Sequence, residues 1–269
     1  MLAARPPDQA AIESVLGAAS HDDIYLSPHS DDICFSLGCL ARQRHAGSLI
    51  TVFPISFYRA DQTSINAGQM LATTRRRLAE DAAFAQACGL GANVLDYPDA
   101  LARGQGPFDS AQYAGASQLI QGKLIAALMG PTVGRRPTSR PWLFCPAGIG
   151  AHVDHLAVLN IVIRGLRQLR THYRVAFYED LHYAANNVRR ERGLEVLRQW
   201  LGGRELQRWS LILDRRHQQE AKLQLVGLYS SQLTPAIRSI RAYTPAVPGP
   251  AVPHEALWMF QEDMHQLPG

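Results

Sequence analysis

Short apolar runs alternate with amphipathic stretches along most of the 269 residues, and this alternation limits the chain to a small set of folds. A short run rich in β-branched or aromatic residues predicts a strand, while apolar residues spaced three and four apart predict a helix. Strands that alternate with helices form a mainly parallel sheet, because each helix carries the chain back to the edge where the next strand begins. We therefore expect an α/β fold, a single Rossmann-like, doubly wound, mainly parallel sheet with helices on both faces.

The expected elements spread over the whole chain. No linker divides it, so residues 1–269 are expected to form a single domain. Four prolines in residues 245–253 predict an extended surface loop, because proline fixes φ and lacks a donor, and a short C-terminal helix is expected over 255–266. The expected strands are 23–27, 49–55, 93–97, 142–146, 174–178 and 209–213. The expected helices are one that starts at 33 and stops at Gly47, and those over 71–88, 156–166 and 216–228.

Composition excludes several classes of protein. Hydrophobic residues make up 46% of the chain, yet no apolar run approaches the roughly 18 residues of a membrane span. The first residues carry acids and two prolines where a signal peptide is apolar, so we expect a cytoplasmic protein. A net charge of +4 without a basic stripe argues against nucleic acid as a partner. The four cysteines form no CxxC pair and are expected to be free, buried thiols.

Candidate metal ligands follow the first expected strand directly. The strand runs into the sequence SPHSDD, which places His29, Asp31 and Asp32 where the first helix starts. Ligands of an open parallel sheet bind at the carboxyl ends of its strands. Imidazole and carboxylate groups are common zinc donors, and a catalytic zinc takes three protein ligands and keeps one position open. An aspartate at a helix start is equally well explained as an N-cap. This motif alone therefore leaves metal site and cap open.

A second expected strand end carries a matching set. Strand 142–146 leads through a glycine-containing turn into the sequence HVDH, again where a helix begins. Two histidines (His152 and His155) and Asp154 in the same context are hard to explain by capping alone. A dinucleotide loop is excluded, because Val153 stands where the third glycine of G-x-G-x-x-G would be. The two strand ends together favour a metal site.

The two motifs resemble the signatures of the LmbE-like, or PIG-L, family of zinc-dependent N-deacetylases. In that family the first motif usually reads H-P-D-D-E and the second H-P-D-H or H-x-D-H. Two positions depart from the pattern, because Ser30 replaces the usual proline and Ile33 the usual glutamate. Further elements resemble the family in the same order along the chain: RLAE at 77–80 before CGL at 88–90, YPD at 97–99, YEDL at 178–181, Lys222 with YSSQ at 229–232, and Glu255 with Trp258.

The resemblance implies roles for the residues of both motifs. It implies one zinc ion (Zn2+) per chain, held by His29, Asp32 and His155. It implies Asp31 as the general base toward water, and His152 as the acid or the partner of the oxyanion. The chemistry of amide hydrolysis calls for the same groups, since an amide needs an activated water, a stabilised oxyanion and a proton for the departing amine. Asp154 is expected either to orient His152 or to cap the helix.

Further residues are weaker candidates for binding substrate. Arg77 belongs to a run of three arginines with acids four residues on, which is typical of a solvated helix face, although Arg77 could reach the site. Glu179 and Asp180 follow an expected strand and could bind sugar hydroxyls or make structural hydrogen bonds. His182 could line the pocket. The pair 189–190 is interpreted as surface charge, or as a contact for a phosphate-bearing substrate.

The resemblance implies a zinc-dependent amide hydrolase. Such an enzyme would remove an N-acyl group, above all N-acetyl, from an amino sugar or amino-sugar conjugate, so the expected partner is a small N-acylated glycoconjugate. The alternative is a non-catalytic metal- or carbohydrate-binding protein on the same fold, in which the changes at Ser30 and Ile33 mark lost activity. The intact Asp31 favours the enzyme, because a binding module has no need of a base beside a metal.

Overall fold

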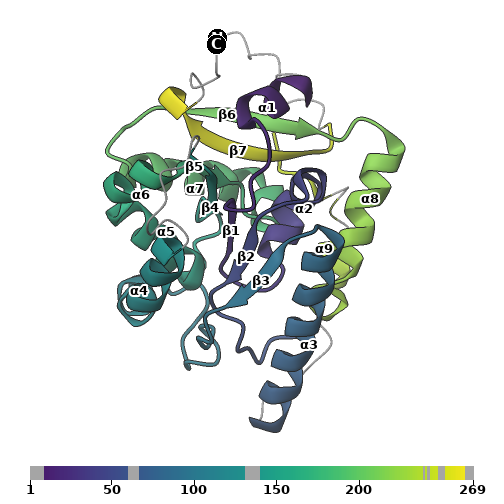
Figure 1. The fold of residues 1–269 in the computed structure, drawn as a ribbon. Coiled ribbons are helices and arrows are strands. Elements are labelled where there is room, and N and C mark those ends of the chain that lie inside the picture. Colours follow the sequence, from purple (N-terminus) through teal and green to yellow (C-terminus); the bar gives the residue numbers. More distant parts are fainter. Residues whose placement is uncertain are drawn as a thin grey trace.

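One sheet of seven strands, in the order β3-β2-β1-β4-β5-β7-β6, forms the centre of the described structure (Figure 1). The computed structural model describes residues 9–59, 67–130, 140–238, 240, 243–247 and 252–263. The strands from β3 to β5 pair in parallel, whereas β7 is antiparallel to both of its neighbours. The strands are β1 (Ile24–Ser27), β2 (Ser48–Thr51), β3 (Gly91–Val94), β4 (Trp142–Pro146), β5 (Arg174–Tyr178), β6 (Leu206–Ile212) and β7 (His254–Phe260).

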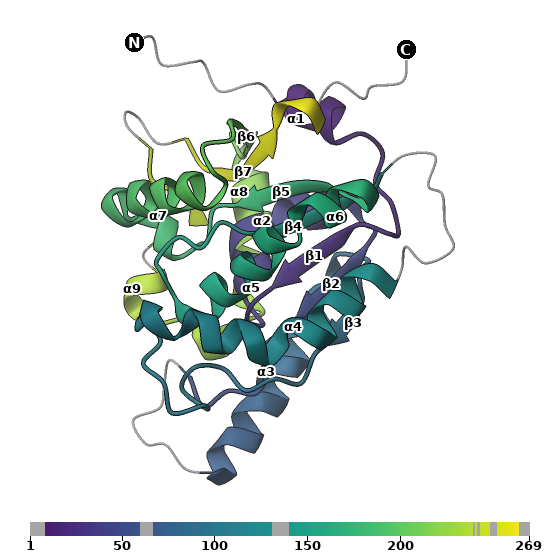
Figure 2. The same ribbon diagram turned by 90° about the vertical axis from the view of Figure 1, so that its left-hand side faces the viewer.

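Helices cover both faces of this sheet. Helices α2, α3 and α8 lie on one face and α4 to α7 on the other (Figures 1 and 2). Among the described residues, no helix combines the length and the apolar character that a membrane span requires. The helices are α1 (Gln9–Leu16), α2 (Asp32–Arg44), α3 (Ala67–Ala87), α4 (Tyr113–Met129), α5 (Val153–Arg164), α6 (Leu166–His172), α7 (Asn187–Trp200), α8 (Arg216–Gly227) and the short α9 (Pro235–Arg238).

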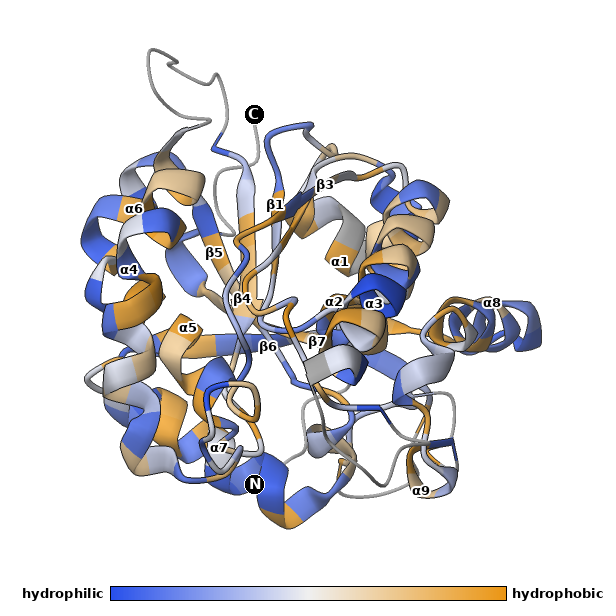
Figure 3. Cartoon of the chain, turned by 90° about the horizontal axis from the view of Figure 1, so that it is seen from below, coloured by the Kyte–Doolittle hydropathy of each residue, from blue (hydrophilic) through white to orange (hydrophobic). Residues whose placement is uncertain are grey.

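The expected fold class is confirmed, and burial explains why the central strands were recognisable. Every residue of β1 and β4 is buried, because helices cover both sides of these strands. Such strands are continuously apolar instead of alternating. Figure 3 shows hydrophobic residues along the strands and on the helix sides that face them. Strands 142–146 and 174–178 have the expected bounds, whereas α4 and α7 lie in stretches where the sequence reasoning placed no element.

The expected C-terminal helix over 255–266 is wrong. Residues His254–Phe260 form β7, which lies between β5 and β6 inside the sheet, and a 3-10 turn follows at Gln261–Asp263. Alanine, leucine, methionine and glutamate favour a helix in isolation, but pairing on both edges and burial on both faces outweigh that preference. The proline-rich segment is described at 245–247 and 252–253, which are neither helix nor strand, while 248–251 and 264–266 lie outside the described residues.

The strand order places the candidate residues together. Strand β1 has β2 on one side and β4 on the other, so the chain changes direction across the sheet between β1 and β4. At such a switch point the loops that leave the two strands diverge and open a crevice at their carboxyl ends. The HSDD and HVDH motifs are the loops that leave β1 and β4. The fold therefore brings residues about 120 positions apart to one edge of the sheet.

Candidate metal centre and catalytic pocket

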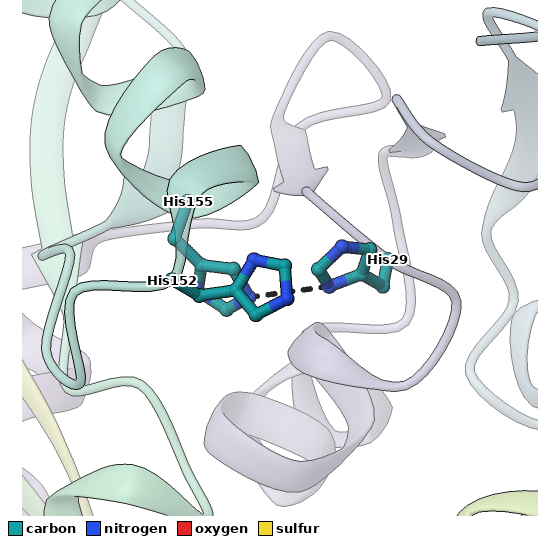
Figure 4. A group of neighbouring side chains, drawn as sticks. All are labelled: His29, His152 and His155. Carbon is teal, nitrogen blue, oxygen red and sulfur yellow. Dashed lines mark hydrogen bonds between the residues drawn. The ribbon is translucent and has the colours of Figure 1, made fainter. Parts of the chain in front are cut away.

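The histidines of both motifs converge at this edge. His29 lies in the turn between β1 and α2, while His152 and His155 lie at the start of α5 (Figure 4). One ring nitrogen from each of the three histidines lies within 4.8 Å of the others, and all three residues are buried. Two sets of three donors could hold a metal ion here. Both contain His29 and His155, and the third donor is either His152 or Asp32.

Asp32 approaches both His29 and His155, with a different carboxylate oxygen toward each. His155 Nε2 lies 3.3 Å from His29 Nδ1 and 3.3 Å from Asp32 Oδ1, and His29 Nδ1 lies 3.4 Å from Asp32 Oδ2. Donors around a tetrahedral ion with bonds of about 2.0–2.1 Å stand about 3.3–3.4 Å apart. Nitrogen and oxygen donors of this kind suit zinc and other first-row divalent ions. The residues present therefore fit a metal ion of the kind that the resemblance implies.

Buried carboxylates fix the orientation of both histidines. His29 Nε2 lies 2.9 Å from Asp154 Oδ2, and His155 Nδ1 lies 2.7 Å from Asp180 Oδ1. With a proton on each of these nitrogens, the other nitrogen of each ring carries a free lone pair that faces Asp32. Carboxylate partners of this kind set the tautomer of metal-binding histidines and raise their basicity.

His152 has a different role from the other two histidines. Its Nδ1 accepts the backbone N–H of Asp154 at 3.2 Å, so His152 itself caps α5. Burial, and then the charges of His29 and His155, lower the pKa of His152 well below its usual value, so the ring is neutral. A neutral ring that accepts at Nδ1 carries its proton on Nε2. In this form His152 carries a hydrogen-bond donor at Nε2.

The carboxylate of Asp31 lines the cavity and does not cap a helix. The residue occupies the N-cap position of α2, yet its side chain makes no capping hydrogen bond. Instead Asp31 Oδ1 accepts from Arg77 Nη2 at 3.0 Å, and Arg77 also donates to Ser56 Oγ at 2.9 Å. Burial raises the pKa of Asp31 and the Arg77 charge opposes that rise. The expectation that Arg77 lies on a solvated face is wrong, since its side chain is buried at the site.

Charge is distributed unevenly within the cluster. Burial lowers the pKa of His29, but its contacts with Asp154 and Asp32 outweigh burial and raise the pKa to about 9. Burial raises the pKa of Asp32, but His155 outweighs it and holds the pKa well below the usual range. Two carboxylates therefore sit beside histidines that bind protons readily, an environment that also stabilises a cation.

The structure corrects the expectations for Asp154 and Arg190. For Glu179 and Asp180 it shows the structural hydrogen bonds that were one of the two expected alternatives. Asp154 holds His29 and not His152, from which its Oδ2 is separated by 3.9 Å. Asp180 does not face substrate, because its two oxygens accept from His155 and from the backbone N–H of Ile149. Glu179 is buried and accepts from Arg190, Arg208 and Trp258. Arg190 is therefore not surface charge. Successive residues at the end of a strand point to opposite faces of the sheet. The sequence alone did not show which face each of these two carboxylates occupies.

A cavity of about 220 Å³ opens beside the cluster. It is lined by Asp31, Arg77 and His182, as the sequence suggested, and by residues that the sequence reasoning did not assign to the site. One of these is Asp99 of the YPD segment, a segment that resembles the family but for which the resemblance implied no role. Arg103, which donates to Asp154 Oδ1 at 2.7 Å, had no sequence signal at all. The remaining lining residues include Phe108, Tyr183, Tyr58 and Gln232.

One curated protein is similar to this chain in sequence. No protein-family model matches the chain. The 2'-N-acetylparomamine deacetylase of Streptomyces fradiae is 30% identical over 187 residues, which are 68% of this chain and 63% of the relative. The match therefore spans less than two thirds of the relative's length.

Solved structures share the fold at lower sequence identity. A deacetylase–bog complex from the teicoplanin biosynthesis pathway has a TM-score of 0.57 at 17% identity, over 87% of this chain and 96% of that one. A pseudoaglycone deacetylase of an antimicrobial reagent has a TM-score of 0.56 at 20% identity, over 90% and 96%. The N,N'-diacetylchitobiose deacetylase of Pyrococcus horikoshii has a TM-score of 0.51 at 12% identity, over 96% and 90%. This fold, this relative and both motifs at adjoining strand ends support the resemblance to the LmbE-like, or PIG-L, deacetylases.

Proposed function

We propose that the protein is a zinc-dependent N-deacetylase that hydrolyses the amide of an N-acetylated amino sugar or amino-sugar conjugate. The observation that carries the proposal is the close approach of His29 and His155 to each other and to the carboxylate of Asp32, with the carboxylate of Asp31 beside them at the cavity. When bound, a divalent ion at such a site lowers the pKa of water and polarises a carbonyl. The rest of the reaction depends on side chains of the chain itself.

Asp31 is placed to move the proton. Arg77 holds one carboxylate oxygen and leaves the side chain at the wall of the cavity. There Asp31 can accept a proton from the attacking water and pass it to the nitrogen that leaves, which a single carboxylate does in two successive steps. Without that second transfer the amine is a poor leaving group.

His152 is placed to stabilise the oxyanion. Its Nδ1 is occupied by the N–H of Asp154, so its Nε2–H is the donor that remains for a ligand in the cavity that it lines. A preorganised donor toward the developing oxygen charge contributes more than one that must first reorient. The cap on α5 keeps this ring from turning.

The substrate class is supported by similarity and by the chemistry of the cavity. The Streptomyces relative is named for deacetylation of an amino sugar derivative. The cavity presents the Asp99 carboxylate and His182 near Asp31 and Arg77, and such polar groups can hydrogen-bond a sugar ring. All four cysteines are free, which suits the cytoplasmic location that we include in the proposal.

The experiment is a deacetylation panel. Zinc-loaded protein is incubated with N-acetylglucosamine, N-acetylated aminoglycoside precursors, neutral N-acetylglucosaminides and N-acyl amino acids, and mass spectrometry follows loss of the acyl group. We expect release from one or more amino sugars and none from the N-acyl amino acids. A protein that keeps its zinc, binds the sugars and releases acetyl from none of them would instead be the non-catalytic binding protein.

A further inference from the structure

A second, larger cavity adjoins the catalytic one and has no part in the reaction described above. It measures about 640 Å³ and lies between α7 and the segment that leads into α4. Phe108 lines both cavities, and its ring meets His152 edge-on at 5.7 Å between centroids. The backbone N–H of Val153 donates to Pro107 O at 2.8 Å, which ties this segment to the HVDH motif. The two cavities therefore lie on either side of Phe108, next to the HVDH motif.

One face of α7 forms a wall of the second cavity. Arg189, Arg192, Val196 and Trp200 all line it, and their spacing of three and four residues places them on one side of the helix. The glutamates of α7, Glu191 and Glu195, do not line the cavity. They contact Asn187, Arg198 and Gln199. No carboxylate is among the residues that line this cavity in the described structure.

The two arginines of this wall differ from the arginines around them. Within the described residues, no hydrogen bond or ion pair engages the guanidinium group of Arg189 or Arg192. By contrast, the neighbouring Arg190 binds both oxygens of Glu179, at 2.6 and 2.8 Å, and Arg198 pairs with Glu195 at 3.4 Å. Two unpartnered guanidinium groups on a cavity wall are a match for an anion, because their fork of donors fits phosphate or carboxylate oxygens.

Close packing holds this wall in place beside the reaction. A Cβ at Gly193 would stand 2.7 Å from Ile149 Cα, so only glycine lets α7 approach the loop that ends at His152 this closely. Gly150 in the same loop has φ +94, and a Cβ there would meet the ring of Tyr183 at 2.4 Å or a little more. The arginine face is thus fixed relative to the catalytic groups.

We propose that the second cavity is a subsite for an anionic group, a phosphate or a carboxylate, carried by the part of the glycoconjugate that extends away from the N-acetyl sugar. The inference rests on the proposed function. The catalytic cavity, at about 220 Å³, is smaller than the roughly 300–1,000 Å³ of typical ligand sites, so the remainder of a conjugate needs further space. Tyr113 and Trp200, with ring centroids 5.0 Å apart, offer an apolar surface to whatever links sugar and anion.

The test compares matched substrates and matched variants. The neutral substrate is 4-carbamoylphenyl N-acetylglucosaminide, and its anionic isosteres carry a carboxylate or a phosphate in place of the carboxamide. We expect the wild-type protein to show a KM for one or both anionic substrates that is lower by roughly tenfold or more, since contacts to charged partners are the strong ones. The double variant Arg189→Gln/Arg192→Gln should lose this preference and keep its kcat and KM for the neutral substrate. Arg198→Gln, an exposed change on the same helix, should behave like the wild type.

Calorimetry separates failure of this inference from failure of the proposed function. Binding of the three compounds to zinc-loaded protein is measured without turnover, at low and at high salt. Tighter binding of an anionic compound, weakened by salt and abolished in the double variant, supports the subsite even if no acetyl is released. Equal binding of all three compounds by a wild-type protein that does release acetyl overturns the subsite and leaves the proposed function intact. Whichever of the two anionic compounds binds more tightly identifies the preferred group as phosphate or carboxylate.

Discussion

Asp31 and Asp32 are chemically identical neighbours, and the fold gives them opposite surroundings. Asp32 faces His29 and His155, whose charges hold its pKa low, and its Oδ2 accepts the N–H of His29 at 2.6 Å. Asp31 faces Arg77 and the cavity, and burial raises its pKa. A turn of one residue at the start of a helix rotates a side chain by about 100°, which is enough to separate a ligand from a base.

Substitution of these two residues tests that division. We expect Asp32→Ala to lose zinc and activity together. We expect Asp31→Asn to keep zinc and the fold while kcat falls about 10² to 10⁴-fold, with a smaller change in KM, because a general base acts mainly in the transition state. Zinc content, melting temperature and kcat of both variants decide the matter. Full activity in Asp31→Asn would show that Asp31 serves the fold and not the reaction.

The surroundings of Asp81 predict how the stability of the protein depends on pH. Burial raises the pKa of this carboxyl to about 7 from 3.8, although Thr51 and Tyr229 donate to it at 2.7 Å each and oppose the shift. A pKa raised in the folded state means that folding favours the protonated form. Its contribution to stability is complete below pH 3.8 and is lost as the pH rises toward about 7.

The variant Asp81→Asn removes this titration. Relative to the variant, the wild type should gain roughly 2–3 kcal/mol in free energy of unfolding when the pH falls from about 7.5 to about 5. Urea unfolding measures the free energy of unfolding of both proteins at the two pH values. Groups other than Asp81 titrate in both proteins, so their effect cancels when the wild type is compared with the variant. Parallel pH dependences would mean that Asp81 is ionised in the folded protein.

At the scale of elements, helix α2 contains a break that a buried ion pair fills. Leu37 has φ −132 and ψ 22, which interrupts the helix in its middle. The backbone N–H groups of Cys39 and Leu40, which an unbroken helix would bond internally, donate to the carboxylate of Glu255 at 2.7 and 2.8 Å. Lys222 donates to Cys34 O at 3.1 Å and to Glu255 at 2.5 Å. The Lys222 cation thus binds the carboxyl end of the first half of α2, and the Glu255 carboxylate binds the amino end of the second half. The helix dipole favours both placements.

Removing both members of this pair should cost less than the sum of the two single removals. Lys222→Met or Glu255→Gln alone leaves a buried group without its partner, and we expect a loss of about 3–5 kcal/mol in the free energy of unfolding. The double variant should lose less than the sum of the two. A double-mutant cycle from chemical unfolding measures the coupling, and additive losses would contradict it. Because α2 begins at Asp32, we also expect weaker zinc binding in each single variant.

The same elements show how far the sequence could lead. Strands β1 and β4 were recognisable because burial on both faces leaves a continuous apolar run with a polar motif at its end. Strand β7 was not, because Glu255 looks like a solvent-facing helical residue until Lys222, which is 33 positions away, neutralises it. Arg77, Glu80 and Asp81 suggested a solvated face for the same reason. Charges that are buried in pairs across long separations carry no local signal.

At the scale of the whole molecule, the proposed metal ligands come from parts of the chain that the sheet holds side by side. His29 and Asp32 leave β1, His155 leaves β4, and Asp180, which orients His155, leaves β5. An ion bound to these residues fastens three strand ends at the edge where the sheet opens into a crevice. An unfolded chain cannot present these donors together, so binding energy adds directly to the stability of the folded state.

Removal of the metal should therefore lower the melting temperature of the whole protein. A free ion concentration of about 1,000 times Kd contributes about 4 kcal/mol, which for a chain of this size corresponds to a rise on the order of 10 °C. We expect chelator-treated wild-type protein to melt lower by about that amount and to recover when zinc is restored. Asp31→Asn should show the same rise, since it keeps all three donors, while Asp32→Ala should melt at one temperature with or without zinc. A wild-type melting temperature that is indifferent to chelation would mean that these donors are held together by the sheet and its hydrogen bonds alone, and that the ion is not an integral part of the fold.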